Sequence, residues 1–147
     1  MTFLLKGTAR IAEAFACGLV SFVAQAVGIF AWCLVAFGCL GYRPSEVVHV
    51  APLCLVLPAF SVLDRGASYV FTRLRPMQGP GHAAIGFMIA AGLASLWILL
   101  LGERPMDAAN LHDMALAGLV FGIPAGLVAH ECSKGARTIV DRFFRVL

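Results

Sequence analysis

Hydrophobic residues fall into four long runs, separated by short stretches rich in charge, glycine and proline. A helix needs about 20 residues to cross about 30 Å of hydrocarbon. We therefore expect four membrane-crossing helices, at residues 14–40, 47–64, 83–101 and 114–130. The stretches between them, GYRPSE, RPMQGPGH and GERPMDAANLHD, have the glycine and proline content of connections.

Composition supports the same interpretation. Of the 147 residues, 61% are hydrophobic and only 13% are charged, a balance outside that of ordinary soluble domains. The five cysteines are dispersed in or beside the apolar runs, so they do not indicate a disulfide framework. The sequence thus predicts an all-α integral membrane protein whose residues 1–147 form a single four-helix transmembrane domain.

Basic residues set the expected orientation. They concentrate in the N-terminal arm, the second connection and the C-terminal tail: Lys6, Arg10, Arg65, Arg73, Arg75, Lys134, Arg137, Arg142 and Arg145. The other two connections hold only Arg43 and Arg104. Because basic loops stay in the cytoplasm, we expect the N and C termini there. The expected location is the bacterial inner (cytoplasmic) membrane, with the chain as a multi-pass protein.

The tail at residues 134–147 has its own pattern. Apolar side chains recur at helical spacing on one face, and basic ones lie mostly on another face. Such a segment next to a crossing is typical of an amphipathic interfacial helix that lies on the cytoplasmic surface and is attracted to anionic lipid. Docking of a cytoplasmic partner would use the same residues and is the alternative.

Small residues are spaced for close helix packing. Gly118, Gly122 and Gly126 are each four residues apart, and the third predicted helix has a matching series, Gly86, Ala90 and Ala94. Stripes without large side chains let helix backbones approach one another. We expect the third and fourth helices to form a tight antiparallel hairpin. The alternative is that the glycine stripe packs against a second copy of the chain or another subunit.

Ionisable residues gather at the predicted cytoplasmic ends of the helices. His130 extends the glycine series by one turn, and the other members of this possible inner polar cluster are Glu13, Asp64, Arg65 and His82. One explanation is boundary charge, since membrane helices end where charge begins. The other is a function, because ionisable side chains that face a bundle interior often mark pathways or sites: a proton or metal relay, or an acid/base pair acting on a lipid headgroup.

The predicted outer side has a weaker candidate for a metal site. Glu46 and His49 have the i, i+3 spacing that di-iron helical bundles use, and His112 and Asp113 begin the fourth crossing on the same side. A complete site of that kind needs a second such pair and two more carboxylates. The simpler explanation is that Ser45 and Glu46 cap the second helix. We expect no cofactor.

The sequence contains no recognised catalytic pattern. Our first hypothesis is a non-enzymatic subunit of a larger membrane complex, such as a secretion or conjugation channel or an energy-transducing assembly. The second is a small homo-oligomeric transporter or channel with a polar gate on the cytoplasmic side, and the third is an interfacial enzyme or metal-binding membrane protein. The expected partners are the lipid bilayer, other membrane subunits or a second copy of the chain, and anionic lipid; no nucleic acid is expected.

Overall fold

The computed structural model describes residues 2–41, 51–70, 77–101 and 108–146. They are almost entirely helical and include no strand, which confirms the all-α prediction. The elements are α1 (Thr2–Cys39), α2 (Ala51–Val70), α3 (Gly79–Leu101), α4 (Ala108–Ala117), the π-helical segment η2 (Gly118–Gly122) and α5 (Ile123–Val146). Side chains are described at residues 12–41, 51–65, 77–100 and 111–142.

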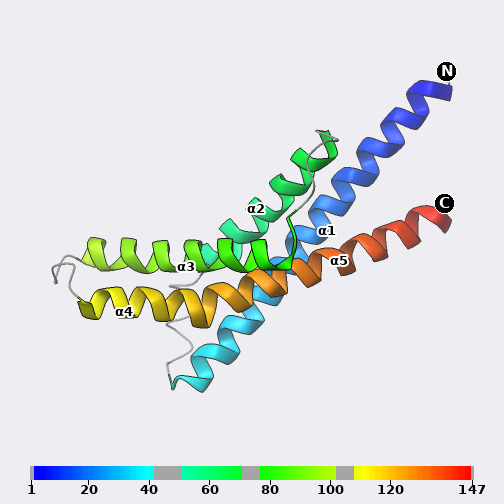
Figure 1. The fold of residues 1–147 in the computed structure, drawn as a ribbon. Helices are drawn as coiled ribbons and strands as arrows, with labels where there is room; N and C mark the ends of the chain where they lie inside the picture. The colour runs from blue at the N-terminus through cyan, green and yellow to red at the C-terminus, as the bar shows by residue number, and fades with distance from the viewer. Residues whose placement is uncertain (1, 42–50, 71–76, 102–107, 147) are drawn as a thin grey trace.

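The helices form two groups that cross obliquely (Figure 1). One group is α3 with the nearly continuous rod of α4, η2 and α5, which runs antiparallel to it. The other is α1 with α2. The N-terminal end of α1 and the C-terminal end of α5 lie at the same end of the molecule, and the ends of α1, α2 and α5 fan out there (Figure 1). Which side of a membrane this end faces stays a prediction.

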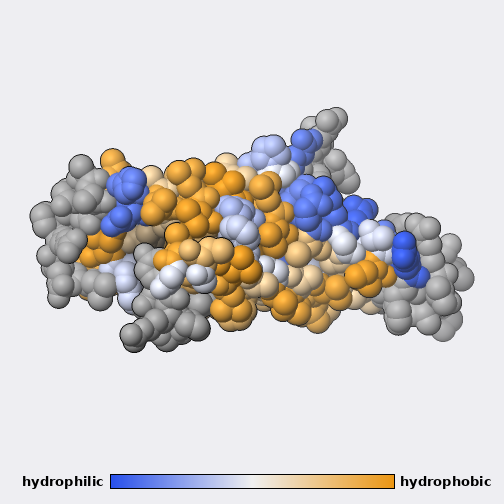
Figure 2. All heavy atoms as spheres, turned by 90° about the horizontal axis from the view of Figure 1, so that it is seen from below, coloured by the Kyte–Doolittle hydropathy of each residue, from blue (hydrophilic) through white to orange (hydrophobic). Residues whose placement is uncertain are grey.

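Three of the described helical stretches are long and apolar enough to cross a membrane: Ala12–Cys39, Gly79–Leu100 and Leu111–Arg142. They contain the predicted crossing at 114–130 completely, and those at 83–101 and 14–40 except for the last residue of each. The predicted crossing at 47–64 corresponds to α2, but residues 47–50 lie outside the described residues, so the four-crossing count stays a prediction. Figure 2 shows hydrophobic residues over most of the middle of one face and strongly hydrophilic residues toward its ends.

The π-helical segment has a chemical cause in Pro124. Proline has no N–H to donate to the carbonyl four residues earlier, and its ring crowds that carbonyl. The carbonyl of Val120 is instead satisfied from another helix, because the indole N–H of Trp32 on α1 donates to it at 3.2 Å. The N–H of Ile123 donates to the carbonyl of Gly118, five residues back, which defines the π turn. The irregularity in the long rod therefore ties it to α1.

Glycines bring α3 and the rod into backbone contact. A Cβ atom added at Gly122 would lie 2.7 Å from the Cα of Phe87, and one added at Gly86 would overlap the carbonyl of Gly122. Gly126 lies just as closely against the carbonyl of His82, whereas Gly118 lies against the Phe87 ring. These contacts occur within one chain, so the close approach of α3 and the rod needs no second copy.

A small apolar core fills the place where the two groups cross. It is built from Ile29, Cys33, Leu53, Cys54, Leu57, Ala90, Ala125 and Ala129. On α1 the packing continues at Gly28, where an added Cβ would lie 2.9 Å from the Cys132 sulfur. Most large apolar side chains point outward, as expected for helices whose outer surface meets lipid.

The C-terminal segment differs from the expected separate tail helix. α5 runs without a break from Ile123 to Val146, so residues 134–146 continue the helix of the last predicted crossing. Ala136 and Val140 are buried, and Lys134 and Arg137 on other faces are exposed. The sequence after Pro124 contains no further proline that would end the helix, and the buried face continues past residue 130, the predicted end of the crossing. The helix therefore continues through this point. A position along the membrane surface stays a prediction.

Candidate functional site

The described part of the chain buries few polar side chains: Ser21, Gln25, Ser61, His82 and Ser133. Three of these, together with Arg65 and His130, form one group between α2, α3 and α5. We call Ser61, Arg65, His82, His130 and Ser133 the polar cluster. Polar and ionisable groups inside a membrane bundle are costly unless they are paired, so each hydrogen bond in this cluster matters.

His82 is the most buried ionisable group of the polar cluster, with 1% of its surface exposed. Its Nδ1 lies 3.2 Å from the carbonyl oxygen of Gln78, and its Nε2 lies 3.3 Å from the Ser61 hydroxyl. A carbonyl can only accept, so Nδ1 carries the proton and donates. In the neutral imidazole, Nε2 then accepts from Ser61. The ring is thus fixed in one tautomer between α2 and α3.

Arg65 joins α2 to α5. One of its terminal nitrogens donates to the carbonyl of Ser133 at 3.1 Å and the other to the Ser133 hydroxyl. That hydroxyl in turn donates to the carbonyl of His130 at 2.6 Å. The Arg65 side chain is half-buried, and arginine remains cationic at any physiological pH.

His130 completes the polar cluster. Its ring centroid lies 5.1 Å from that of His82, with the two planes inclined at 50°. A Cβ added at Gly79 would lie 3.4 Å from the His130 ring, an ordinary van der Waals contact, which places the start of α3 beside the imidazole. The His130 Nδ1 and the Arg65 Nε are both buried without a hydrogen-bond partner. The cluster therefore holds two polar atoms with unused hydrogen-bonding capacity.

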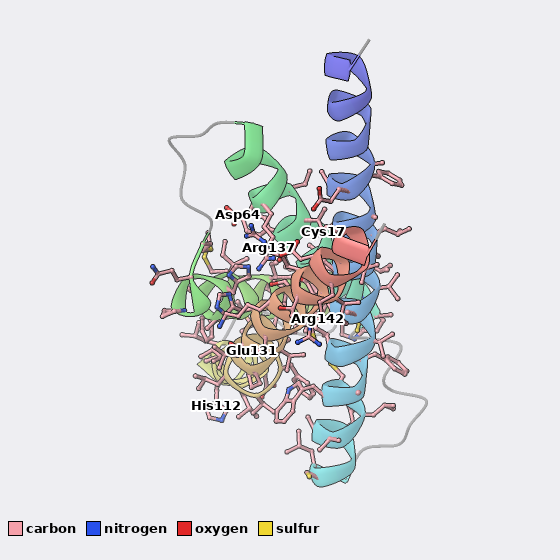
Figure 3. All side chains as sticks on the ribbon, turned by 90° about the vertical axis from the view of Figure 1, so that its right-hand side faces the viewer. Cys17, Asp64, His112, Glu131, Arg137 and Arg142 are labelled. Atoms are coloured by element: carbon pink, nitrogen blue, oxygen red, sulfur yellow. The ribbon has the colours of Figure 1, made fainter. Side chains whose placement is uncertain are left out.

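The structure brings together three of the five residues expected in the inner polar cluster: Arg65, His82 and His130. Asp64 lies beside them and accepts a hydrogen bond from the backbone N–H of Met77 at 3.0 Å, which links the end of α2 to the segment before α3. Asp64, Arg137 and Cys17 each interact electrostatically with Arg65, and they come from three different helices, α2, α5 and α1 (Figure 3). Glu13 is half-buried on α1, and among the described residues no hydrogen bond or ion pair joins it to the polar cluster.

Ser61 and Ser133 were not predicted to belong to this cluster. Both carried a usable signal: Ser61 lies four residues before Arg65, and Ser133 lies three residues after His130, so each shares a helix face with an ionisable residue. The prediction of the cluster used ionisable residues only, and serine carries no charge. The serines supply hydrogen bonds that make their burial possible.

The expected outer site is only partly visible. Glu46 and His49 lie outside the described residues. His112 and Asp113 are exposed near the start of the rod, and Figure 3 shows His112 pointing away from the bundle. Among the side chains that the structure describes, no three histidine, cysteine or acidic residues are grouped so as to hold a metal ion.

The polar cluster is not open to covalent chemistry in this conformation. A serine hydroxyl bonded to a histidine whose other nitrogen is fixed resembles an activated nucleophile. Ser61, however, is fully buried, so no substrate can reach it in this conformation. What the cluster does bring together is two imidazoles, with ring centroids 5.1 Å apart, and a permanent cation between three packed helices.

Comparison of the chain with protein-family models, with curated proteins and with solved structures finds no match. Its function must therefore be argued from its own residues.

Proposed function

We propose that the chain is a non-enzymatic subunit of a larger membrane complex, such as a secretion or conjugation channel or an energy-transducing assembly. In this role it contributes packed helices and an anchoring C-terminal helix end. The observation that carries the proposal is the length of its two main helices. α1 has 38 residues, or about 57 Å at 1.5 Å per residue, and the apolar stretch Leu111–Arg142 has 32, or about 48 Å.

Both lengths exceed the hydrocarbon thickness of about 30 Å. α3 begins at Gly79, beside His130, whereas α5 continues from His130 to Val146. Those sixteen further residues correspond to about 24 Å of helix beyond the start of α3. The ends of α1 and α5 diverge (Figure 1), and each has a large apolar side chain that the described residues leave exposed, Phe15 on α1 and Ile139 on α5.

Charge on the end of α5 supports the same proposal. Lys134, Arg137 and Arg142 are exposed there. Lys134 pairs with Glu131 at 2.7 Å, while Arg137 lies 3.9 Å from Asp141. Exposed pairs of this kind contribute little stability, so the basic groups remain available. An acidic partner surface or the headgroups of anionic lipids would complement them.

Site-specific photo-crosslinking in native membranes tests the proposal. A benzophenone side chain at Ile139, an exposed apolar position on the α5 end, should give one discrete protein adduct. The same probe at Met88, an exposed position in the middle of α3, should react mainly with lipid. A stable monomer in mild detergent that co-purifies with no other protein, together with no adduct at Ile139, would contradict the proposal.

The second candidate function is a small homo-oligomeric transporter or channel whose gate is the polar cluster. The buried His82 and the neighbouring His130 support it, because the two imidazole rings lie between three packed helices and histidine is the side chain that most often carries protons through proteins. Proton or ion flux into liposomes should then fall in the variants Glu13→Gln and His130→Ala. Unchanged flux in both would exclude this role.

A further inference from the structure

At the end of the bundle opposite the chain termini, the described helices form a partly open pocket of about 370 Å³. Five of the six described elements line it, all except α5: Phe37 from α1, Leu53 from α2, Trp97 from α3, Asp113 from α4 and Phe121 from η2 are among its lining residues. Small-molecule sites are typically mostly apolar pockets of about 300–1,000 Å³ with a few polar groups that fix orientation. The size and lining of this pocket match that description.

The aromatic side chains are held in place by the helix packing. The rings of Phe37 and Phe121 stack with their centroids 4.9 Å apart and their planes inclined at 38°. Phe121 belongs to the π turn, and the indole N–H of Trp32 donates a hydrogen bond to the carbonyl of the preceding residue, Val120. π turns within α-helices often occur at functional sites. Here the π turn determines the position of one wall of the pocket.

Asp113 gives the pocket its charge. Among the described residues that line the pocket it is the one ionisable side chain, and it lies exposed near the start of the rod. Aromatic faces attract cations through their quadrupoles, and a carboxylate adds a full opposite charge. The Asp113 carboxylate would repel an anion, and a neutral apolar molecule would gain no charge contact from it.

We propose that this pocket binds a monovalent, lipophilic organic cation, such as a quaternary ammonium or phosphonium ion. The apolar part contacts the aromatic rings and Leu53, and the positive charge lies near Asp113. The proposal does not depend on whether the chain acts alone or within a larger assembly. It concerns the opposite end of the bundle from the polar cluster.

Two probes of matched size and shape but opposite charge test the proposal on the unaltered protein. Tetraphenylphosphonium should bind the purified chain saturably in a neutral detergent, with one site in equilibrium dialysis. Tetraphenylborate should bind at least about tenfold more weakly, a difference that corresponds to one favourable charge contact. Equal binding of the two ions, or no saturable phosphonium binding, would overturn the proposal.

Variants locate the site. Asp113→Asn should weaken phosphonium binding about tenfold, and Ala94→Leu should weaken it by filling the pocket. Asp141→Asn removes a carboxylate at the other end of the bundle and should leave binding unchanged. Unchanged binding in Asp113→Asn, or a co-purifying phospholipid that phosphonium does not displace, would show that the pocket is not a cation site.

Discussion

The close approach of α3 and the rod makes Gly122→Ala a sensitive test of the fold. The added methyl group would lie 2.7 Å from the Cα of Phe87, about 0.7 Å short of the distance at which ordinary contact begins, and it would also overlap the carbonyl of Gly86. Both neighbours are backbone atoms, so no side chain can rotate away. α3 must therefore move away from the rod by about this distance, and each neighbouring contact that opens loses about a quarter to a half of its van der Waals attraction.

The expected cost follows from two opposing effects. Overpacking a close contact typically costs about 1–3 kcal/mol, whereas alanine is favoured over glycine within a helix by up to about 1 kcal/mol. We expect a net loss of about 1–2 kcal/mol in the free energy of unfolding. Unfolding by SDS in mixed micelles, followed by the fluorescence of Trp32 and Trp97, measures it.

Gly135→Ala is the matched control. It lies on α5, and a Cβ added there meets no atom within 4 Å. Helix propensity then acts alone, so this variant should be neutral or stabilised by up to about 1 kcal/mol. If both alanines shift the SDS midpoint in the same stabilising direction, the backbone contact between α3 and the rod is not present as described.

Three further predictions concern two hydrogen-bonded contacts and the accessibility of the cysteines. Trp32→Phe leaves the Val120 carbonyl without a donor and should lower the free energy of unfolding by about 1–3 kcal/mol. Adding Pro124→Ala restores a backbone N–H that can bond the same carbonyl, so the double variant should recover much of this loss. If the effects of the two substitutions simply add, Trp32 and Pro124 do not act on the same carbonyl. Arg65→Met should destabilise the protein more than Ser133→Ala in the same SDS assay. The arginine variant removes both hydrogen bonds between α2 and α5, whereas the serine variant keeps the one to the Ser133 carbonyl. Equal destabilisation by the two variants would count against the described geometry. In detergent, the exposed Cys39 should react with maleimide, whereas the buried Cys33 and Cys54 should react only after unfolding, which mass spectrometry of labelled peptides can establish.

The helical class and three apolar spans follow from the hydrophobic runs, because run length and composition are properties of the sequence alone. Contacts between helices are harder to predict. The four-residue spacing singled out Gly86 and Gly122, which lie against each other in the structure, yet the same spacing gives no indication that Gly118 contacts the Phe87 ring. That contact depends on the local winding of the rod, which the spacing of small residues does not specify.

The composition of the polar cluster shows the same limit. Arg65, His82 and His130 were found because charged residues are rare in this chain, and helix length placed them at one depth. Ser61 and Ser133 look like ordinary small residues until the rotation of each helix is known. Conversely, the continuity of α5 was missed because amphipathic residues after a crossing fit both a surface helix and a helix that packs on its neighbours.

The π turn also determines which mutations this chain can tolerate. A π turn contains one more residue than the α-helical turn that would replace it. Deleting one residue between Gly118 and Gly122 would let the rod return to regular α-helical winding with α4 and α5 in nearly the same relative rotation, because the extra residue is absorbed within the turn. A one-residue deletion in the regular part of α5 would instead rotate everything after it by about 100°, and the residues beyond the deletion would lose their alignment with the neighbouring helices. The rod should therefore tolerate a one-residue deletion within the π turn better than one within α5.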